Sequence, residues 1–213
     1  MRRILIIFTL LLTLSTNSLC QVSVVVKAGI NLSSYSGLNS SEKDLQEYKP
    51  GYMFSADVEI PLIASLYVEP ALTLIQKGAQ FSGKVNGENM TMRVSPTYIE
   101  IPVMLGYRFP ILENVSLTVQ AGPYASYGFG GHWKYESEGS SHDADAFGNT
   151  LGIEKQEAFS KKRWDYGVGA GAGLEVDRFL FRASYALGLA KVKRDVYGDI
   201  KNRSLAFAIG YRF

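Results

Sequence analysis

The chain has 213 residues, of which 46% are hydrophobic and 12% aromatic, with 22 basic and 20 acidic side chains. This length fits a single domain, and a mean hydropathy near zero does not fit a helical membrane protein, which needs apolar runs of about 20 residues. The nearly balanced charge gives no reason to expect nucleic acid as a partner.

The first 20 residues have the organisation of a secretory signal peptide. Two arginines precede an apolar stretch at residues 4–14, and a polar segment and a small-x-small motif follow it. This pattern predicts cleavage between Cys20 and Gln21, which leaves residues 21–213 as the mature domain. A lipid anchor on Cys20 is the alternative, but bulky Leu19 before the cysteine disfavours it. Cleavage would remove the single cysteine and leave as many basic as acidic side chains.

Eight segments of the mature chain alternate apolar residues with polar or small ones, as half-buried β-strands do. In chain order they span residues 22–32, 52–62, 66–77, 98–109, 115–129, 164–176, 179–189 and 204–213. Short connections at 61–65, 110–114 and 177–178 alternate with longer polar ones at 33–50, about 79–95, 130–163 and 191–202. An even number of strands with short turns at one end is typical of outer-membrane barrels. We therefore predict an all-β fold, an eight-stranded antiparallel transmembrane β-barrel with both termini on the short-turn, periplasmic side.

The apolar face of these segments carries the large aromatic side chains, and the other face carries the charges, the glycines and the small residues. The aromatic residues gather at strand ends: Tyr52, Phe54, Tyr127, Phe129, Trp164 and Tyr166 near the long loops, and Tyr107, Phe109, Phe179, Phe181, Tyr211 and Phe213 near the turns. Two such girdles are expected at the two interfaces of a bilayer. A soluble β-sandwich or lipocalin-like barrel, the alternative, would hide its apolar face inside. The pattern therefore predicts outer-membrane lipid as the surroundings of the barrel.

Three prolines, Pro70, Pro102 and Pro123, fall inside the predicted strands. Each removes one backbone donor from the hydrogen-bond ladder, and a closed barrel has no edge strand to accommodate it. We therefore expect bulges or local bends at these positions.

Six segments also carry a family resemblance: VKAGINLSSYSG, SLYVEPALTLIQKGAQFSG, PTYIEIPVMLGYRF, AGPYASYGFGG, WDYGVGAGAGLEV and the terminal GYRF. They resemble the outer-membrane β-barrel domain family of Gram-negative bacteria, often labelled porin family or PorT-like. The resemblance covers nearly all of the mature chain and implies an eight-stranded barrel in the cell outer membrane. It also implies that Tyr211 and Phe213 form a C-terminal signal for the barrel-assembly machinery. It implies no single activity, because the family includes structural barrels, adhesion-type proteins and a secretion-associated factor.

Eleven charged side chains fall on the predicted lumen face: Lys27, Asp57, Glu59, Glu69, Lys77, Glu100, Arg108, Asp165, Glu175, Arg182 and Arg212. Eight strands leave an interior that side chains can fill, and unpaired charges there are costly. We therefore expect an interlocked ionic plug, with a narrow proton or ion path as the alternative. Pairing by sign favours a register that places Glu69 opposite Arg108 and Lys77 opposite Glu100.

Glycines at 167, 169, 171 and 173 alternate along one predicted strand and are expected to make room for Tyr67, Tyr98 and Tyr124. Two histidines, His132 and His142, lie near acidic residues in the 130–163 loop. Such a pair would suit a hydrolase dyad or a metal site, but no strand carries a matching partner, so no catalytic, cofactor or metal site is predicted.

Function follows from these features only at a general level. We predict a structural or cell-surface interaction protein that is not an enzyme, with an extracellular ligand at the 130–163 loop. A narrow porin or channel for small solutes and a secretion-system accessory barrel are the alternatives, and a lipid-modifying barrel enzyme ranks behind them.

Overall fold

The computed structural model describes residues 22–38, 43–85, 88–137, 140–147, 163–191, 193–195 and 198–213. Their strands are β1 (Ser23–Ser36), β2 (Gln46–Glu47), β3 (Lys49–Pro61), β4 (Leu66–Gln76), β5 (Ala79–Val85), β6 (Glu88–Leu112), β7 (Val115–Ser137), β8 (Ser140–Asp145), β9 (Trp164–Val176), β10 (Phe179–Gly188), β11 (Lys193–Asp195) and β12 (Gly198–Arg212). The predicted signal peptide, with Cys20 and Gln21, lies outside the described residues. Within the described ranges, no helix is long and apolar enough to cross a membrane.

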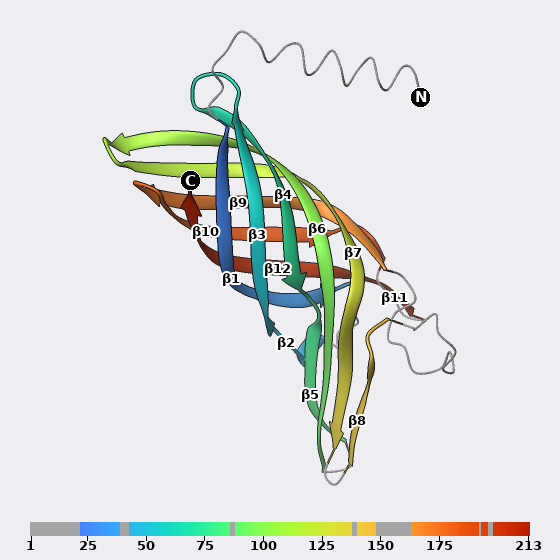
Figure 1. The fold of residues 1–213 in the computed structure, drawn as a ribbon. Coiled ribbons are helices and arrows are strands. Elements are labelled where there is room, and N and C mark those ends of the chain that lie inside the picture. The colour runs from blue at the N-terminus through green and yellow to red at the C-terminus, as the bar shows by residue number, and fades with distance from the viewer. Residues whose placement is uncertain are drawn as a thin grey trace, which may run out of the picture.

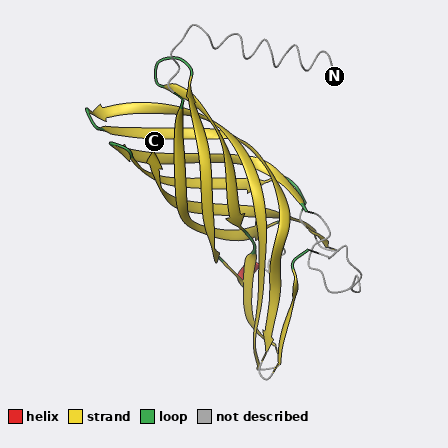
Figure 2. Ribbon diagram, viewed as in Figure 1, coloured by secondary structure: helices red, strands yellow, loops and turns green. Residues whose placement is uncertain are grey.

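Eight of these strands form a closed ring in the order β6, β4, β3, β1, β12, β10, β9 and β7, which the pairing of β6 with β7 completes (Figure 1; Figure 2). Every pair in the ring is antiparallel. The prediction of an eight-stranded antiparallel barrel is therefore confirmed. The start of β1, the end of β12 and the short turns lie at one end, here called the turn end, and the opposite end is called the loop end (Figure 1).

The wall of the barrel is inside out compared with a soluble protein. Along β9, outward-facing Trp164, Tyr166 and Val168 are exposed, whereas inward-facing Asp165 and Glu175 are buried. The same alternation gives exposed apolar and buried polar side chains around the ring. Because exposed apolar area of this extent is unfavourable in water, the outer surface fits the hydrocarbon of a bilayer.

Two strands continue far beyond the barrel. β6 has 25 residues and β7 has 23, whereas a strand of about 9–11 residues crosses a bilayer. At the loop end β5 pairs with β6, β2 with β5, and β8 with β7. These strands, with residues 88–96 of β6 and 130–137 of β7, form the projecting sheet (Figure 1).

The long polar connections contain strands that the sequence pattern did not predict, and within the 130–163 connection β7 and β8 form a hairpin. Within these connections, strands occupy residues 33–36, 46–47, 49–50, 79–85, 88–95, 130–137, 140–145, 193–195 and 198–202. The alternation does continue there, for example with Met90, Met92 and Val94 between Asn89, Thr91 and Arg93. It was missed because apolar residues are fewer there than in the strands that face lipid.

No register shift marks the three prolines, so the bulges expected there are wrong, although the ladders have short gaps beside them. β4 and β6 pair at Pro70 and Val103, and they resume in the same register beyond a short gap. Pro123 pairs with Val168 in an unshifted ladder. The register shifts of β6 and β7 lie instead between Thr97 and Tyr98 and near the turn. Neighbouring pairs hold the closed wall in place where a proline removes one donor.

Candidate functional site

The charged lumen is the feature that distinguishes the interior of this barrel. The structure places all eleven predicted charges on the lumen face and joins them by ion pairs at three heights. We name these the turn-end layer (Glu59, Arg108, Glu175 and Arg212), the middle layer (Lys27, Asp57, Glu69 and Arg182) and the loop-end layer (Lys77, Glu100 and Asp165).

The turn-end layer is a ring of alternating charge. Arg108 lies 2.7 Å from Glu59 and 2.9 Å from Glu175, and Arg212 lies 2.9 Å and 2.7 Å from the same two carboxylates. The guanidinium of Arg108 also lies over the ring of Tyr67, 5.2 Å from its centroid. Two cations therefore neutralise two carboxylates, and each carboxylate accepts hydrogen bonds from both arginines.

The middle layer is buried more completely. Lys27 forms ion pairs with Asp57 and with Glu69, the latter at 3.0 Å, and Arg182 donates a hydrogen bond to Glu69. The hydroxyl of Ser55 donates to Asp57. This layer is also neutral, and the Glu69 side chain is only 2% exposed, so each charge depends on its partners for stabilisation.

The loop-end layer has one cation between two carboxylates. Lys77 lies 2.7 Å from Glu100 and 3.0 Å from Asp165, and its ammonium is 4.4 Å from the ring centroid of Tyr124. Asn202 donates a further hydrogen bond to Asp165 at 3.0 Å. Asn202 and Tyr124 thus add polar and aromatic contacts to a layer that has two carboxylates and one ammonium group.

An apolar cap covers the lumen beyond the loop-end layer. Ile75, Tyr98, Ala146 and Phe147 form a buried cluster, and the rings of Tyr98 and Phe147 meet edge to face at 5.6 Å. The Ala146 N–H donates to the carbonyl of Gly131, which holds the segment after β8 against the barrel. This cap is not predictable from the sequence pattern, because the segment containing Phe147 shows no alternation.

Little space remains between the middle and loop-end layers. A cavity of about 70 Å³ lies there, and its lining includes Lys27, Glu69, Lys77, Glu100 and Arg182. This volume suits a few water molecules. Charged side chains therefore occupy the lumen at three heights, and an apolar cluster occupies it at a fourth.

The predicted pairing across β4 and β6 needs correction. Met104, not Arg108, lies opposite Glu69, and Thr73 lies opposite Glu100. The Lys77–Glu100 ion pair does form, although the two residues are not ladder partners. The prediction failed because it considered one hairpin alone, whereas in a closed barrel a long side chain reaches across the lumen to strands distant in sequence.

Glycines make room for the lumen tyrosines, but only partly as predicted. A Cβ atom on Gly167 would lie 2.8 Å from Tyr124, so this glycine does accommodate that ring. Tyr67 lies against Gly106 instead, where an added Cβ would be 2.2 Å from the ring. Tyr98 packs on Phe147.

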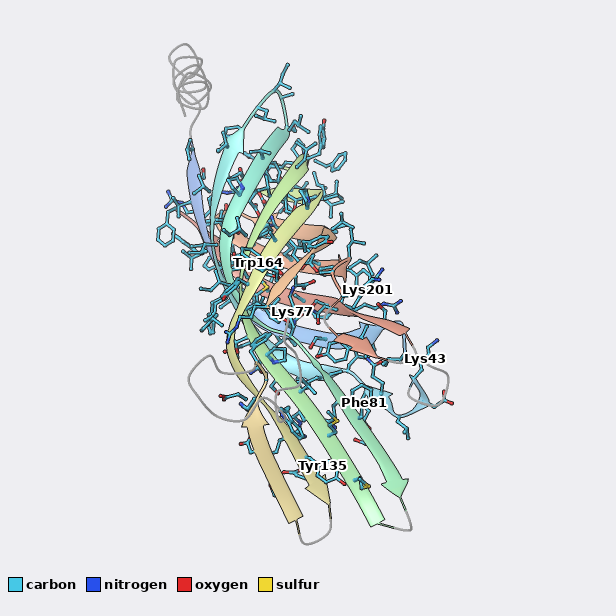
Figure 3. All side chains as sticks on the ribbon, turned by 90° about the vertical axis from the view of Figure 1, so that its right-hand side faces the viewer. Lys43, Lys77, Phe81, Tyr135, Trp164 and Lys201 are labelled. Carbon is cyan, nitrogen blue, oxygen red and sulfur yellow. The ribbon has the colours of Figure 1, made fainter. Side chains whose placement is uncertain are left out.

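The projecting sheet has two different faces. Phe81, Met92 and Tyr135 are direct cross-strand neighbours and share one half-buried face (Figure 3). The other face is polar, and a hydrogen bond from Lys134 lowers the pKa of the exposed Glu136 carboxyl there. The sheet therefore presents an apolar stripe and a charged surface on opposite sides.

The histidines lie on this sheet. His132 is the ladder partner of Asp145, and His142 is that of Tyr135. Within the described part of the chain, no group of three histidine, cysteine, aspartate or glutamate residues could hold a metal ion.

The last residues complete the turn end of the wall. The rings of Tyr211 and Phe213 lie 5.0 Å apart, and Tyr211 also contacts Phe179 at 5.5 Å. The Phe213 N–H donates to the carbonyl of Val24 at 2.9 Å, while its side chain is 70% exposed. An exposed terminal aromatic is the feature from which the assembly signal was predicted.

The family described as outer membrane protein beta-barrel domain matches residues 17–194. No curated protein matches the sequence of the chain.

Among solved structures, the chain is similar to the attachment invasion locus protein Ail of Yersinia pestis, which was solved in complex with the heparin analogue sucrose octasulfate. The two sequences are 18% identical, the match covers 90% of this chain and 99% of that chain, and the TM-score is 0.43. Neisserial surface protein A is 12% identical, with 90% and 97% covered and a TM-score of 0.44. OprG from Pseudomonas aeruginosa is 10% identical, with 91% and 97% covered and a TM-score of 0.48.

Proposed function

Because the chain belongs to the outer membrane protein beta-barrel domain family, we propose that it is a closed barrel that carries a rigid β-sheet on the cell surface for interaction with a partner. Export through a signal peptide at residues 1–20 and assembly through Tyr211 and Phe213 belong to the same proposal. In this orientation the turn end faces the periplasm and the projecting sheet lies outside the cell.

The ionic filling of the lumen is the observation that carries the closed-barrel part of the proposal. The turn-end and middle layers are each neutral, and each of their carboxylates contacts at least one cation. Breaking such a buried pair costs about 3–5 kcal/mol, so the layers do not separate readily to let a solute pass. The apolar cap at Phe147 adds a further barrier.

The projecting sheet supports the surface-interaction part. Its strands are continuous with the barrel wall, so its position is fixed by the ladder rather than by a flexible loop. Aromatic and methionine side chains, such as those of Tyr135, Phe81 and Met92, are enriched in the centres of protein interfaces. Small barrels of this family are typically non-enzymatic, and we propose no catalytic role, cofactor or metal for this one.

Conductance in planar lipid bilayers tests the closed lumen. We expect no stable single-channel current from the refolded protein under conditions in which an open porin, the positive control, conducts. Arg108→Gln with Arg212→Gln removes the cations of one layer, and this variant should also stay silent because the middle and loop-end layers remain. A discrete current from the unaltered protein would refute the proposal.

Cysteine labelling of intact cells tests the orientation. His132 on the projecting sheet and Ile63 in a short turn are both exposed, and the predicted mature chain has no cysteine of its own. We expect His132→Cys to react with a membrane-impermeant maleimide on intact cells, and Ile63→Cys to react only after lysis. The opposite pattern would show that the barrel is inserted the other way round, and the unaltered chain is the background control.

A narrow porin for small solutes is the second candidate, and the cavity of about 70 Å³ inside the lumen is the observation in its favour. The conductance measurement separates it from the closed barrel. The secretion-accessory alternative, which the PorT-like resemblance implies, has no structural observation in its favour within the described residues.

A further inference from the structure

Two of the short turns carry exposed aliphatic side chains. The turn between β3 and β4 has Leu62 and Ile63, which are 55% and 74% exposed. The turn between β6 and β7 has Ile111 and Leu112, which are 59% and 67% exposed (Figure 1). We call these four residues the turn-end rim. Exposed apolar groups that gather at one end of a molecule indicate contact with a membrane or a partner.

The turn-end rim continues the lipid-facing wall without a break. Leu62 follows Val58 on the outward face of β3, and Ile111 follows Tyr107 and Phe109 on that of β6. Ile111 lies two residues beyond Phe109, about 7 Å along a strand, and the head-group region of a bilayer is about 5–7 Å thick on each side. Because the strands of a barrel are tilted, the turn remains within that region.

The backbone of the first turn is hydrogen-bonded, as a segment in contact with lipid requires. The Leu62 N–H donates to the Leu66 carbonyl at 2.8 Å, and the Leu66 N–H donates to the Ile63 carbonyl at 3.0 Å. The Ser65 carbonyl accepts from the N–H of Arg108 at 2.9 Å. These bonds satisfy backbone groups that lipid could not satisfy.

The second turn is closed in a similar way. Leu112 pairs with Val115 in the ladder, and the Asn114 carbonyl accepts from the N–H of Asp177 at 2.8 Å. Pro110, which precedes the turn, has no N–H that would need a partner. Both turns thus pair backbone groups within the protein, which lowers the free-energy cost of placing them next to lipid.

The third short turn has a different character. Asp177 and Arg178 connect β9 with β10, and both residues are exposed. Charged side chains at this level favour water over lipid. We call Asp177 and Arg178 the charged turn. Aliphatic side chains are therefore not a general property of the turns of this barrel, and the charged turn provides an internal comparison.

We propose that the turn-end rim inserts into the lipid leaflet at the turn end, with its side chains at the boundary between head groups and acyl chains. Lipid is favoured over a protein partner because the rim is continuous with a wall that lipid covers, and a bilayer surrounds both turns at once. The charged turn stays in water. Insertion anchors the turn end, since moving it into water would expose four aliphatic side chains. The proposal requires a barrel in a membrane, but neither a closed lumen nor a particular orientation.

Site-directed spin labelling of the refolded barrel in lipid nanodiscs tests the insertion, because reagents reach both faces of a nanodisc. Ile63→Cys and Leu112→Cys place a nitroxide label on the rim, and Arg178→Cys is the matched control on the charged turn. Molecular oxygen concentrates in lipid, whereas a neutral nickel chelate stays in water. We expect the ratio of oxygen to nickel collision rates to be several-fold higher for both rim labels than for the control.

Two results would overturn the proposal. A ratio on the rim equal to that of the control would place the turns in water. Low collision rates with both reagents would show that protein, such as a second copy of this chain, covers the rim.

Thiol reactivity provides a second measurement that needs no label on the rim. The rate of reaction with a water-soluble maleimide is divided by the rate for the same variant unfolded in urea. This ratio should be at least about tenfold lower for Ile63→Cys and Leu112→Cys than for Arg178→Cys, because an apolar environment suppresses the reactive thiolate. The reaction of Ile63→Cys after lysis is thereby slowed, not abolished. Equal ratios in barrels that keep the gel mobility of the folded protein would contradict insertion.

Discussion

Glu69 offers the sharpest test of the lumen network. Its carboxylate accepts from Lys27 at 3.0 Å and from Arg182, and the side chain is almost completely buried. Glu69→Gln would leave Lys27 and Arg182 facing Asp57 alone, with one uncompensated charge in the middle layer. Removing one partner of a buried pair costs about 3–5 kcal/mol. We expect a loss of this size in the free energy of unfolding.

The identity of the partner is what the test decides. Adding Arg182→Gln to Glu69→Gln removes the surplus cation and restores the balance between Lys27 and Asp57. The double variant should therefore be more stable than the sum of the single changes by about 0.5–3 kcal/mol. Arg108→Gln is the matched control, since Arg108 belongs to the turn-end layer, and its effect should add to that of Glu69→Gln within about 0.5 kcal/mol.

Urea unfolding of the refolded barrel in phosphatidylcholine vesicles, followed by tryptophan emission, measures the free energy of unfolding of the unaltered protein and of each of these variants. Loss of the difference in mobility between boiled and unboiled samples on gels gives a second readout of the folded barrel. Coupling of Glu69 to Arg108, with none to Arg182, would refute the reasoning and would support the register expected from the hairpin alone.

Two further predictions concern packing and assembly. Gly106→Ala should destabilise the barrel by about 1–3 kcal/mol in the same urea titration, because an added Cβ would lie 2.2 Å from the fully buried ring of Tyr67. Gly130→Ala is the control and should be nearly neutral, because nothing lies within 4 Å of the added atom. Equal effects of the two substitutions would contradict this packing. Phe213→Asp should lower the fraction of folded protein recovered from outer membranes, whereas Arg212→Gln should lower the stability but not that fraction. Equal recovery of the two variants would mean that the terminal aromatic does not direct assembly.

The barrel could be predicted from sequence because its physical signal is local. Each outward-facing residue, such as Val168, alternates with a small or polar neighbour, such as Gly167. This period of two can be recognised in the sequence without knowing which strand pairs with which. The same parity placed Glu69 and Arg108 on the lumen face. Which charges meet there depends on the closure of the ring, and this is a long-range property that no single hairpin contains.

The features that were missed have the same origin. Phe147 is buried because it folds back over Tyr98 from a segment far along the chain. The rings of Tyr127 and Trp164 pack edge to face at 5.2 Å on neighbouring strands, although the two residues are far apart in sequence. Clusters of this kind become visible only when the strand order and register are known.

The unbroken course of β6 and β7 also has a mechanical consequence. Within the ring, these strands are bonded to each other and to β4 and β9, and they continue without interruption into the projecting sheet. A pull on the tip of the sheet would act along the strand axes. The ladder hydrogen bonds would then carry the load side by side in shear, whereas a pull across the strands would peel them apart one at a time. In the proposed orientation, tension applied to the projecting sheet at the cell surface would therefore pass directly into the barrel wall.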